Sequence, residues 1–140
     1  MSSCFENERV EDRKKIMKKK VIIIDDSRTV RDHVRLVLEP AGYEVLEAVD
    51  ARDGIDKVRG HRDLAMAICD VNMPGMTGIG MLEELKTSGL GEGLPIVMLT
   101  TEGQPALMQK AKQAGARGWI VKPFKPEQLL ATVHKLAGAA

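Results

Sequence analysis

Short apolar runs alternate five times along the chain with segments whose apolar residues recur every three or four positions. The runs cover residues 20–25, 43–48, 64–69, 95–100 and 118–121. Runs of this length, rich in aliphatic residues, predict β-strands, and the spacing between them predicts amphipathic helices. Because strands that alternate with helices favour a parallel sheet covered on both faces, the pattern predicts an α/β fold.

Capping and turn residues mark where the predicted helices begin and end. Ser27 and Asp50 are expected to cap the first two helices, and Pro105 suits the first turn of the fourth. Gly42 and Gly115 are expected at the carboxyl ends of the first and fourth helices, since glycine commonly terminates a helix. No linker to a second domain is evident between these elements.

Polar side chains follow four of the predicted strands directly. In a parallel sheet the carboxyl ends of the strands meet at one rim, where ligands bind. Taken singly, each of these residues has a plain alternative: a helix cap, a turn residue, a strand hydroxyl or a surface cation. Together they predict a functional site, made of Asp25 and Asp26, Asp70, Thr100 and Thr101, and Lys122.

The charges of this set restrict its chemistry. Two carboxylates about 4 Å apart repel by roughly 4 kcal/mol at an effective dielectric constant of 20, and one lysine does not balance three of them. Either one carboxyl group is protonated or a divalent cation lies between them, and an all-oxygen site suits Mg²⁺, with Mn²⁺ as a substitute. A cation, a lysine and a hydroxyl group indicate phosphoryl transfer, with a carboxylate as the possible acceptor. No glycine-rich nucleotide loop follows the first strand, so the phosphoryl group is expected to arrive on a partner.

Composition and charge support one cytoplasmic domain with a charged extension. The 140 residues are 44% hydrophobic and 29% charged, without an apolar run near 18 residues, which predicts a soluble protein with no membrane span. Residues 21–140 hold 14 Lys and Arg against 16 Asp and Glu, a net charge of −2 that argues against a nucleic-acid surface. Cys4 and Cys69 form no disulfide framework, and no secretory signal is evident. We expect a flexible extension at residues 1–17 and the globular domain at 18–140.

Four motifs together resemble the response-regulator receiver family, and within it the stand-alone chemotaxis regulators. They are "IIIDDS" at residues 22–27, "CDVNMPGMTG" at 69–78, "VMLTTEG" at 97–103 and "AGARGWIVKPF" at 114–124. The resemblance covers residues 18–138. It implies a doubly wound, flavodoxin-like (βα)5 fold whose parallel strands lie in the order 2-1-3-4-5.

The resemblance also implies a role for each site residue. Asp70 would accept a phosphoryl group from a phosphohistidine of a chemotaxis-type histidine kinase, Lys122 would contact that group, and Thr100 would form a switch with Trp119. Magnesium would be bound by Asp26, Asp70 and the backbone carbonyl of Asn72, with Asp25 acting through water. Asn72 and Glu102 would tune self-dephosphorylation, and the Lys122–Pro123 bond is expected to be cis. Two positions depart from the family pattern, Trp119 (more often Tyr or Phe) and Thr77 (often acidic or an amide).

The family further implies a signalling protein rather than an enzyme, monomeric and without nucleic-acid or membrane partners. Its output would be a phosphorylation-dependent protein-binding face formed by the fourth helix, the fifth strand and the last helix, with the flagellar motor switch as the implied target. Two alternatives stay open: a receiver that shuttles or drains phosphoryl groups in another relay, and a Mg²⁺-dependent phosphohydrolase that uses Asp70. The second is disfavoured because position 72, where such enzymes place another carboxylate, is Asn72. A flavin module is disfavoured because three acidic groups would oppose a flavin phosphate.

Overall fold

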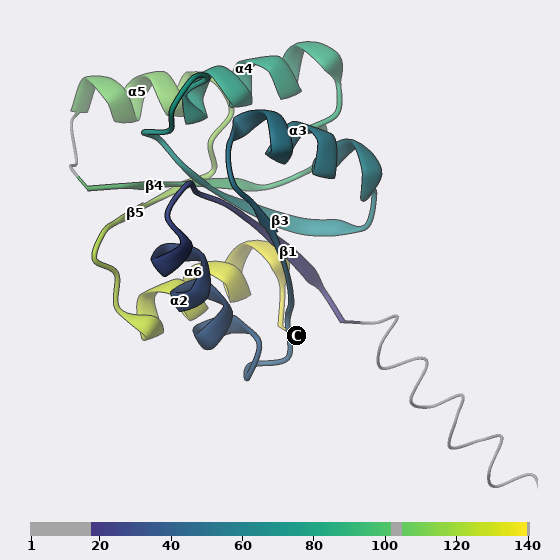
Figure 1. Cartoon of the computed structure of the whole chain (residues 1–140), viewed down its shortest axis with the longest axis vertical. Helices are drawn as coiled ribbons and strands as arrows, with labels where there is room; N and C mark the ends of the chain where they lie inside the picture. Colours follow the sequence, from purple (N-terminus) through teal and green to yellow (C-terminus); the bar gives the residue numbers. More distant parts are fainter. Residues whose placement is uncertain (1–17, 102–104, 140) are drawn as a thin grey trace, which may run out of the picture.

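The computed structural model describes residues 18–101 and 105–139 and contains a five-stranded parallel sheet (Figure 1). The strands lie in the order β2-β1-β3-β4-β5, as expected. Their bounds are β1 (Lys20–Ile24), β2 (Glu44–Ala48), β3 (Leu64–Asp70), β4 (Ile96–Thr100) and β5 (Gly118–Val121). The predicted α/β fold and strand order are therefore confirmed.

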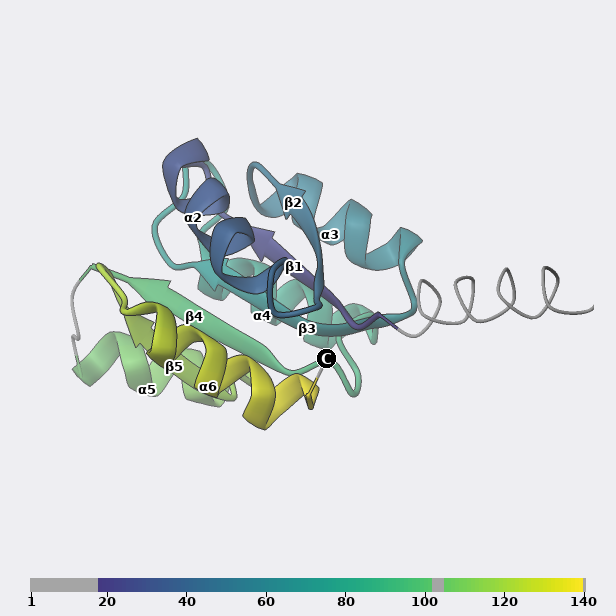
Figure 2. The same cartoon turned by 90° about the horizontal axis from the view of Figure 1, so that it is seen from below.

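Helices cover both faces of the sheet. On one face lie α3 (Ala51–Gly60), α4 (Gly78–Ser88) and α5 (Pro105–Gln113), and on the other lie α2 (Arg28–Leu38) and α6 (Pro126–Ala137). Figure 2 views the molecule from the side of α2 and α6. Each face has its own apolar core. Ile22, Ile24 and Met98 face the α3–α5 layer, whereas Ile23, Ile68 and Leu99 face the α2 and α6 layer.

Strand β1 is buried on both faces, which explains its unbroken aliphatic sequence. Val21, Ile22, Ile23 and Ile24 are completely buried, because β1 lies between β2 and β3 and under helices on either side. In a strand, successive side chains point to opposite faces, so neither face of β1 can carry polar residues. The chain therefore becomes polar at once where the strand ends, at Asp25.

The helix ends agree with the sequence in most places and differ in one. Ser27 and Asp50 cap α2 and α3 by accepting hydrogen bonds from Val30 N–H and Asp53 N–H. Helix α2 ends at Leu38 rather than next to Gly42, since helices usually stop before a proline and Pro40 follows two residues later. Gly42, with φ of 100°, instead occupies the turn into β2.

None of the helices within the described residues is long and apolar enough to cross a membrane.

Candidate functional site

The acidic pair follows β1, and its two members have different surroundings. Asp25 is fully buried and Asp26 is exposed. The Asp25 carboxylate is held at both oxygens: Oδ1 accepts from the Ser27 N–H at 2.8 Å, and Oδ2 accepts from Lys122 Nζ at 3.0 Å. Its backbone N–H donates to the Ala48 carbonyl across the β1–β2 pair at 3.1 Å. Asp25 is thus fixed, while Asp26 faces solvent.

Asp70 is the last residue of β3 and lies beside this pair. Only 4% of it is exposed, and its Oδ1 is 3.2 Å from Lys122 Nζ. Asp25, Asp26 and Asp70 each place a carboxylate oxygen within 4.8 Å of those of the other two. The structure therefore brings together three acids that are up to 45 residues apart, because β1 and β3 are neighbours in the sheet.

Two further predicted residues, Lys122 and Thr100, come from the ends of β5 and β4. The Lys122 N–H donates to the Thr100 carbonyl at 2.7 Å, which aligns the segment after β5 with the end of β4. The Lys122–Pro123 bond is cis, as predicted. Thr100 is buried, with 1% exposed, whereas Thr101 is exposed. Lys122 consequently reaches across the rim to contact both Asp25 and Asp70.

Burial and charge shift the pKa values of the central groups. Burial, followed by the nearby charge of Asp25, raises the pKa of the Asp70 carboxyl group, although Lys122 and the Asn72 N–H act in the opposite direction. For Lys122, burial acts to lower the pKa, but the hydrogen bonds and charges of Asp25 and Asp70 outweigh it and raise the pKa. Lys122 therefore stays cationic, and Asp70 is held in an environment that disfavours its negative charge.

The donor set fits a hard divalent cation. Three carboxylates and one ammonium group, all ionised, leave a formal charge of −2, which a divalent cation would neutralise. All the available ligand atoms are oxygens, and the exposed Asp26 gives access from solvent. Among the described residues, no other group of three or more His, Cys, Asp or Glu side chains is arranged in this way. Cys69 is not a candidate ligand, because burial raises the pKa of its thiol well above the usual range.

The remaining predicted residues lie around this cluster. Asn72 is exposed, two residues after Asp70. Trp119 lies half-buried on β5, level with Met98 of β4, and its Nε1 is buried without a hydrogen-bond partner among the described residues. Glu102 falls outside the described residues. The sequence analysis proposed no histidine as a metal ligand. In the structure, His33 is exposed and stacks on the buried Phe124, with ring centroids 4.7 Å apart.

The sequence analysis gave no role in the site to three residues that lie near it, Arg31, Thr77 and Gly78. Arg31 donates to the Asp25 carbonyl at 2.7 Å. The sequence feature that could have drawn attention to Arg31 is its positive charge near the start of a helix, where the helix dipole disfavours cations. Thr77 caps α4 by accepting from the Gly80 N–H, which gives a local reason for its departure from the family pattern. Gly78 packs so closely on the Asp70 carbonyl that a Cβ atom there would clash with it.

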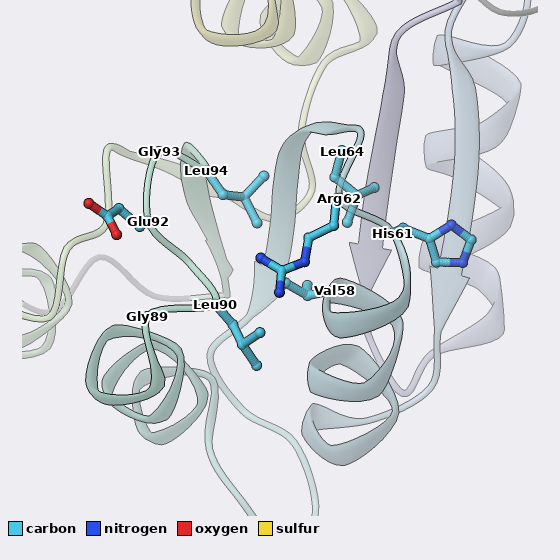
Figure 3. Close-up of a pocket in the computed structure, with 9 residues that line it drawn as sticks. All are labelled: Val58, His61, Arg62, Leu64, Gly89, Leu90, Glu92, Gly93 and Leu94. Carbon is cyan, nitrogen blue, oxygen red and sulfur yellow. The ribbon is translucent and has the colours of Figure 1, made fainter.

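Figure 3 shows a cavity of about 340 Å³ whose lining includes none of the residues of the acidic cluster. It is lined by the end of α3 and by segments that precede β3 and β4: Val58, His61, Arg62, Leu64, Gly89, Leu90, Glu92, Gly93 and Leu94. Because these segments lead into strands, the cavity is at the amino-terminal rim of the sheet. The acidic site occupies the opposite, carboxyl-terminal rim and is separate from this cavity.

Comparison with known proteins agrees with this geometry. The family model of the response regulator receiver domain matches residues 21–134. The chemotaxis protein CheY1 of Helicobacter pylori is 35% identical over 120 residues, which cover 85% of this chain and 97% of that protein. The solved structure of the chemotaxis protein CheY4 of Vibrio cholerae matches with a TM-score of 0.80 and 42% identity, covering 85% of this chain and 98% of that one. A CheY-like receiver domain protein of Methanospirillum hungatei matches with a TM-score of 0.79 and 30% identity, over 86% of this chain and 94% of that one.

Sheet order, the acidic rim and sequence similarity along most of the chain thus lead to one assignment. The chain belongs to the response-regulator receiver family and is similar along most of its length to chemotaxis regulators.

Proposed function

We propose that this protein is a phosphorylation-activated response regulator of a two-component system, with Asp70 as the phosphoacceptor. The observation that supports this most directly is the position of Asp70: it ends β3 beside Asp25 and Asp26, with the Lys122 ammonium 3.2 Å from its Oδ1. The domain would span residues 18–140, and residues 1–17, which lie outside the described residues, would form a charged extension.

The phosphoryl group would come from a phosphohistidine of a histidine kinase. A carboxylate oxygen of Asp70 attacks phosphorus, a P–O bond forms, and the P–N bond breaks with its electron pair remaining on the imidazole nitrogen. Such a step depends on positioning and charge neutralisation more than on acid–base help. Lys122 offsets negative charge on one phosphoryl oxygen, and the Thr100 hydroxyl donates a hydrogen bond to another.

The residues that would hold Mg²⁺ are Asp26, Asp70 and the backbone carbonyl of Asn72, with Asp25 acting through water. When bound, Mg²⁺ supplies positive charge that neutralises the carboxylates and the phosphoryl oxygens, and Mn²⁺ would substitute for it. The buried Asp25, already held by Ser27 and Lys122, suits a supporting role, whereas the exposed Asp26 suits direct contact with a hydrated cation.

The output surface would be the face formed by α5, β5 and α6. Phosphorylation adds a charge of about −1.5 to −2 at Asp70, and a shift of Thr100 toward it would allow Trp119 to turn inward. The ring already lies against the core and its Nε1 lacks a partner among the described residues, so a second arrangement that satisfies this group is physically reasonable. A coupling of about 1–3 kcal/mol, or roughly 5–150-fold in partner affinity, would be typical.

We infer chemotaxis as the biological setting, since several of the similar proteins are named as chemotaxis proteins. The partners would be a chemotaxis-type histidine kinase and the flagellar motor switch, met in the cytoplasm by a monomer. Receivers of this kind are signalling proteins, and we propose that the phosphorylated state of this one decays by intrinsic dephosphorylation, tuned by Asn72 and Glu102.

The test of the proposed function is phosphorylation with acetyl phosphate in the presence of Mg²⁺, followed by intact-protein mass spectrometry. Wild type should gain one phosphoryl group, and Asp70→Asn should gain none. Asp63→Asn is the matched control, because Asp63 is an exposed acid just before the same strand and should leave labelling unchanged. Equal labelling of wild type and Asp70→Asn would disprove the proposal.

A second measurement separates chemotaxis from another relay. The phosphorylated protein should bind a flagellar motor-switch peptide more tightly than the unphosphorylated protein does. Phosphorylation without such a change in affinity would favour the phosphoryl shuttle.

A further inference from the structure

Arg31 of α2 connects the acidic pair to the edge strand β2. Its Nη1 donates to the backbone carbonyl of Asp25 at 2.7 Å, and its Nε donates to Glu47 Oε1 at 3.0 Å. The side chain is largely buried, with 12% exposed. A buried guanidinium group placed between a carbonyl and a carboxylate has a defined geometry, because its donors lie in one rigid plane.

The carbonyl that Arg31 holds belongs to the peptide between Asp25 and Asp26. Since a peptide unit is planar, the direction of the Asp25 carbonyl also sets the direction of the Asp26 N–H and the path of the chain into Asp26. Asp25 is fixed independently by the contacts of its carboxylate with Ser27 and Lys122. Asp26 is exposed, so the peptide before it has a large part in deciding where its carboxylate points.

Glu47 in turn holds Arg31. The second oxygen of Glu47 accepts from Arg35 Nη1 at 2.7 Å, so both oxygens of this carboxylate are used. Arg35 lies one turn further along α2 and also pairs with Glu39 at 2.9 Å. Within the described residues, no hydrogen bond or ion pair joins Arg35 to Asp25, so the two arginines share Glu47 but differ in their relation to the site.

We propose that Arg31 is a positioning residue of the cation site, oriented by Glu47, which holds the Asp25–Asp26 peptide so that the Asp26 carboxylate is directed toward the ion. This inference rests on the proposed function, in which Asp25, Asp26 and Asp70 serve a Mg²⁺ site. Groups that orient metal ligands without touching the metal typically contribute about 10–100-fold to metal affinity.

The experiment is a calorimetric titration of the full chain with Mg²⁺, comparing wild type, Arg31→Met and Arg35→Met. Arg31→Met should bind Mg²⁺ about 10-fold more weakly than wild type, within the range for such orienting residues. Arg35→Met removes a contact with the same Glu47 from the same helix, and its affinity should stay within about 2-fold of wild type. Arg31→Lys should bind with intermediate affinity, because an ammonium group can reach one of the two acceptors but not hold both in one plane.

A measurement on the metal-free protein tests the positioning itself. The amide ¹⁵N resonance of Asp26 should shift in Arg31→Met and stay in place in Arg35→Met. An unchanged Mg²⁺ affinity in Arg31→Met would overturn this inference and leave the proposed function intact. Equal losses in the two Met variants would also overturn it, by showing a general effect on α2. If wild type bound no Mg²⁺, the proposed function and this inference would both fail.

Discussion

Asp70→Asn should stabilise the metal-free protein, although it removes the proposed phosphoacceptor. The oxygens of Asp70 and Asp25 lie within 4.8 Å, which corresponds to a repulsion of at least about 3.5 kcal/mol at an effective dielectric constant of 20. Lys122, at 3.2 Å from Asp70, returns an attraction of about 5 kcal/mol on the same basis. The two charge effects largely offset each other, and the exposed Asp26 adds a screened repulsion.

The cost of burying the Asp70 carboxylate then decides the sign. Only 4% of Asp70 is exposed, and taking an ion out of water costs several kcal/mol, whereas an amide of the same shape costs much less. This agrees with the raised pKa of Asp70, for which burial is the largest cause. We expect the free energy of unfolding to rise by about 1–2 kcal/mol, and the melting temperature by about 3–8 °C for a domain of this size.

The assay is thermal unfolding at pH 7 in EDTA, repeated in saturating Mg²⁺. The advantage of Asp70→Asn should shrink or reverse with Mg²⁺, because a ligand that binds the folded wild type more tightly stabilises it more. The advantage of Asp70→Asn over wild type should also shrink as the pH falls toward 3.8, the usual pKa of Asp. Because the pKa of Asp70 is raised in the folded state, that state binds the proton more tightly than the unfolded state, and acidification stabilises wild type relative to the variant. Asp56→Asn, at an exposed acid on α3, is the control and should change little. A melting temperature that falls in Asp70→Asn without metal would refute the reasoning.

Three further outcomes follow from the same contacts. Gly78→Ala should lower the free energy of unfolding, measured by urea denaturation, by about 3 kcal/mol or more, because the new Cβ would clash with the Asp70 carbonyl. Gly80→Ala should lower it much less, because a Cβ there meets only side chains at 3.3 Å. Equal losses in the two variants would contradict this reasoning. Lys122→Met should destabilise the metal-free protein by about 3–5 kcal/mol in urea denaturation, because it leaves the buried carboxylates of Asp25 and Asp70 without their cation. An unchanged urea midpoint would be inconsistent with the observed pairing. Burial acts to raise the pKa of Glu47, but the hydrogen bonds from its two arginines outweigh burial and lower the pKa below 4.5. Wild type should therefore be more stable than Glu47→Gln at neutral pH, and this difference in the free energy of unfolding should disappear as the pH falls through the lowered pKa. A difference that does not change with pH would contradict this prediction.

The local sequence was sufficient for the elements and for the amino-terminal caps of two helices. Short apolar runs and apolar residues that recur every three or four positions depend on neighbouring residues alone, so the strands and helices could be assigned without tertiary information. The same holds for Ser27 and Asp50, whose caps form within three residues. The end of α2 was misplaced, because Gly42 was interpreted as the stop and the effect of Pro40 was not considered.

The location of the site was also largely predictable. In a parallel α/β sheet, the residues that follow strands necessarily collect at one rim, so Asp25, Asp26, Asp70, Thr100 and Lys122 could be grouped before their neighbours in space were known. The alternation of strands and helices leaves the strand order open, and only the resemblance to the receiver family implied the order that the sheet has.

Tertiary structure alone decided how the acids differ and what holds them. Asp25 and Asp26 are chemically identical neighbours, yet one is fully buried against Lys122 and the other faces water. Arg31 acquires its place because α2 packs against β2, which brings Glu47 within 3.0 Å of it. Sequence determines which groups can ionise and which strand ends they follow. Burial and contacts between distant segments determine which charges must be paired, because both the cost of a charge and the identity of its partner depend on the folded chain.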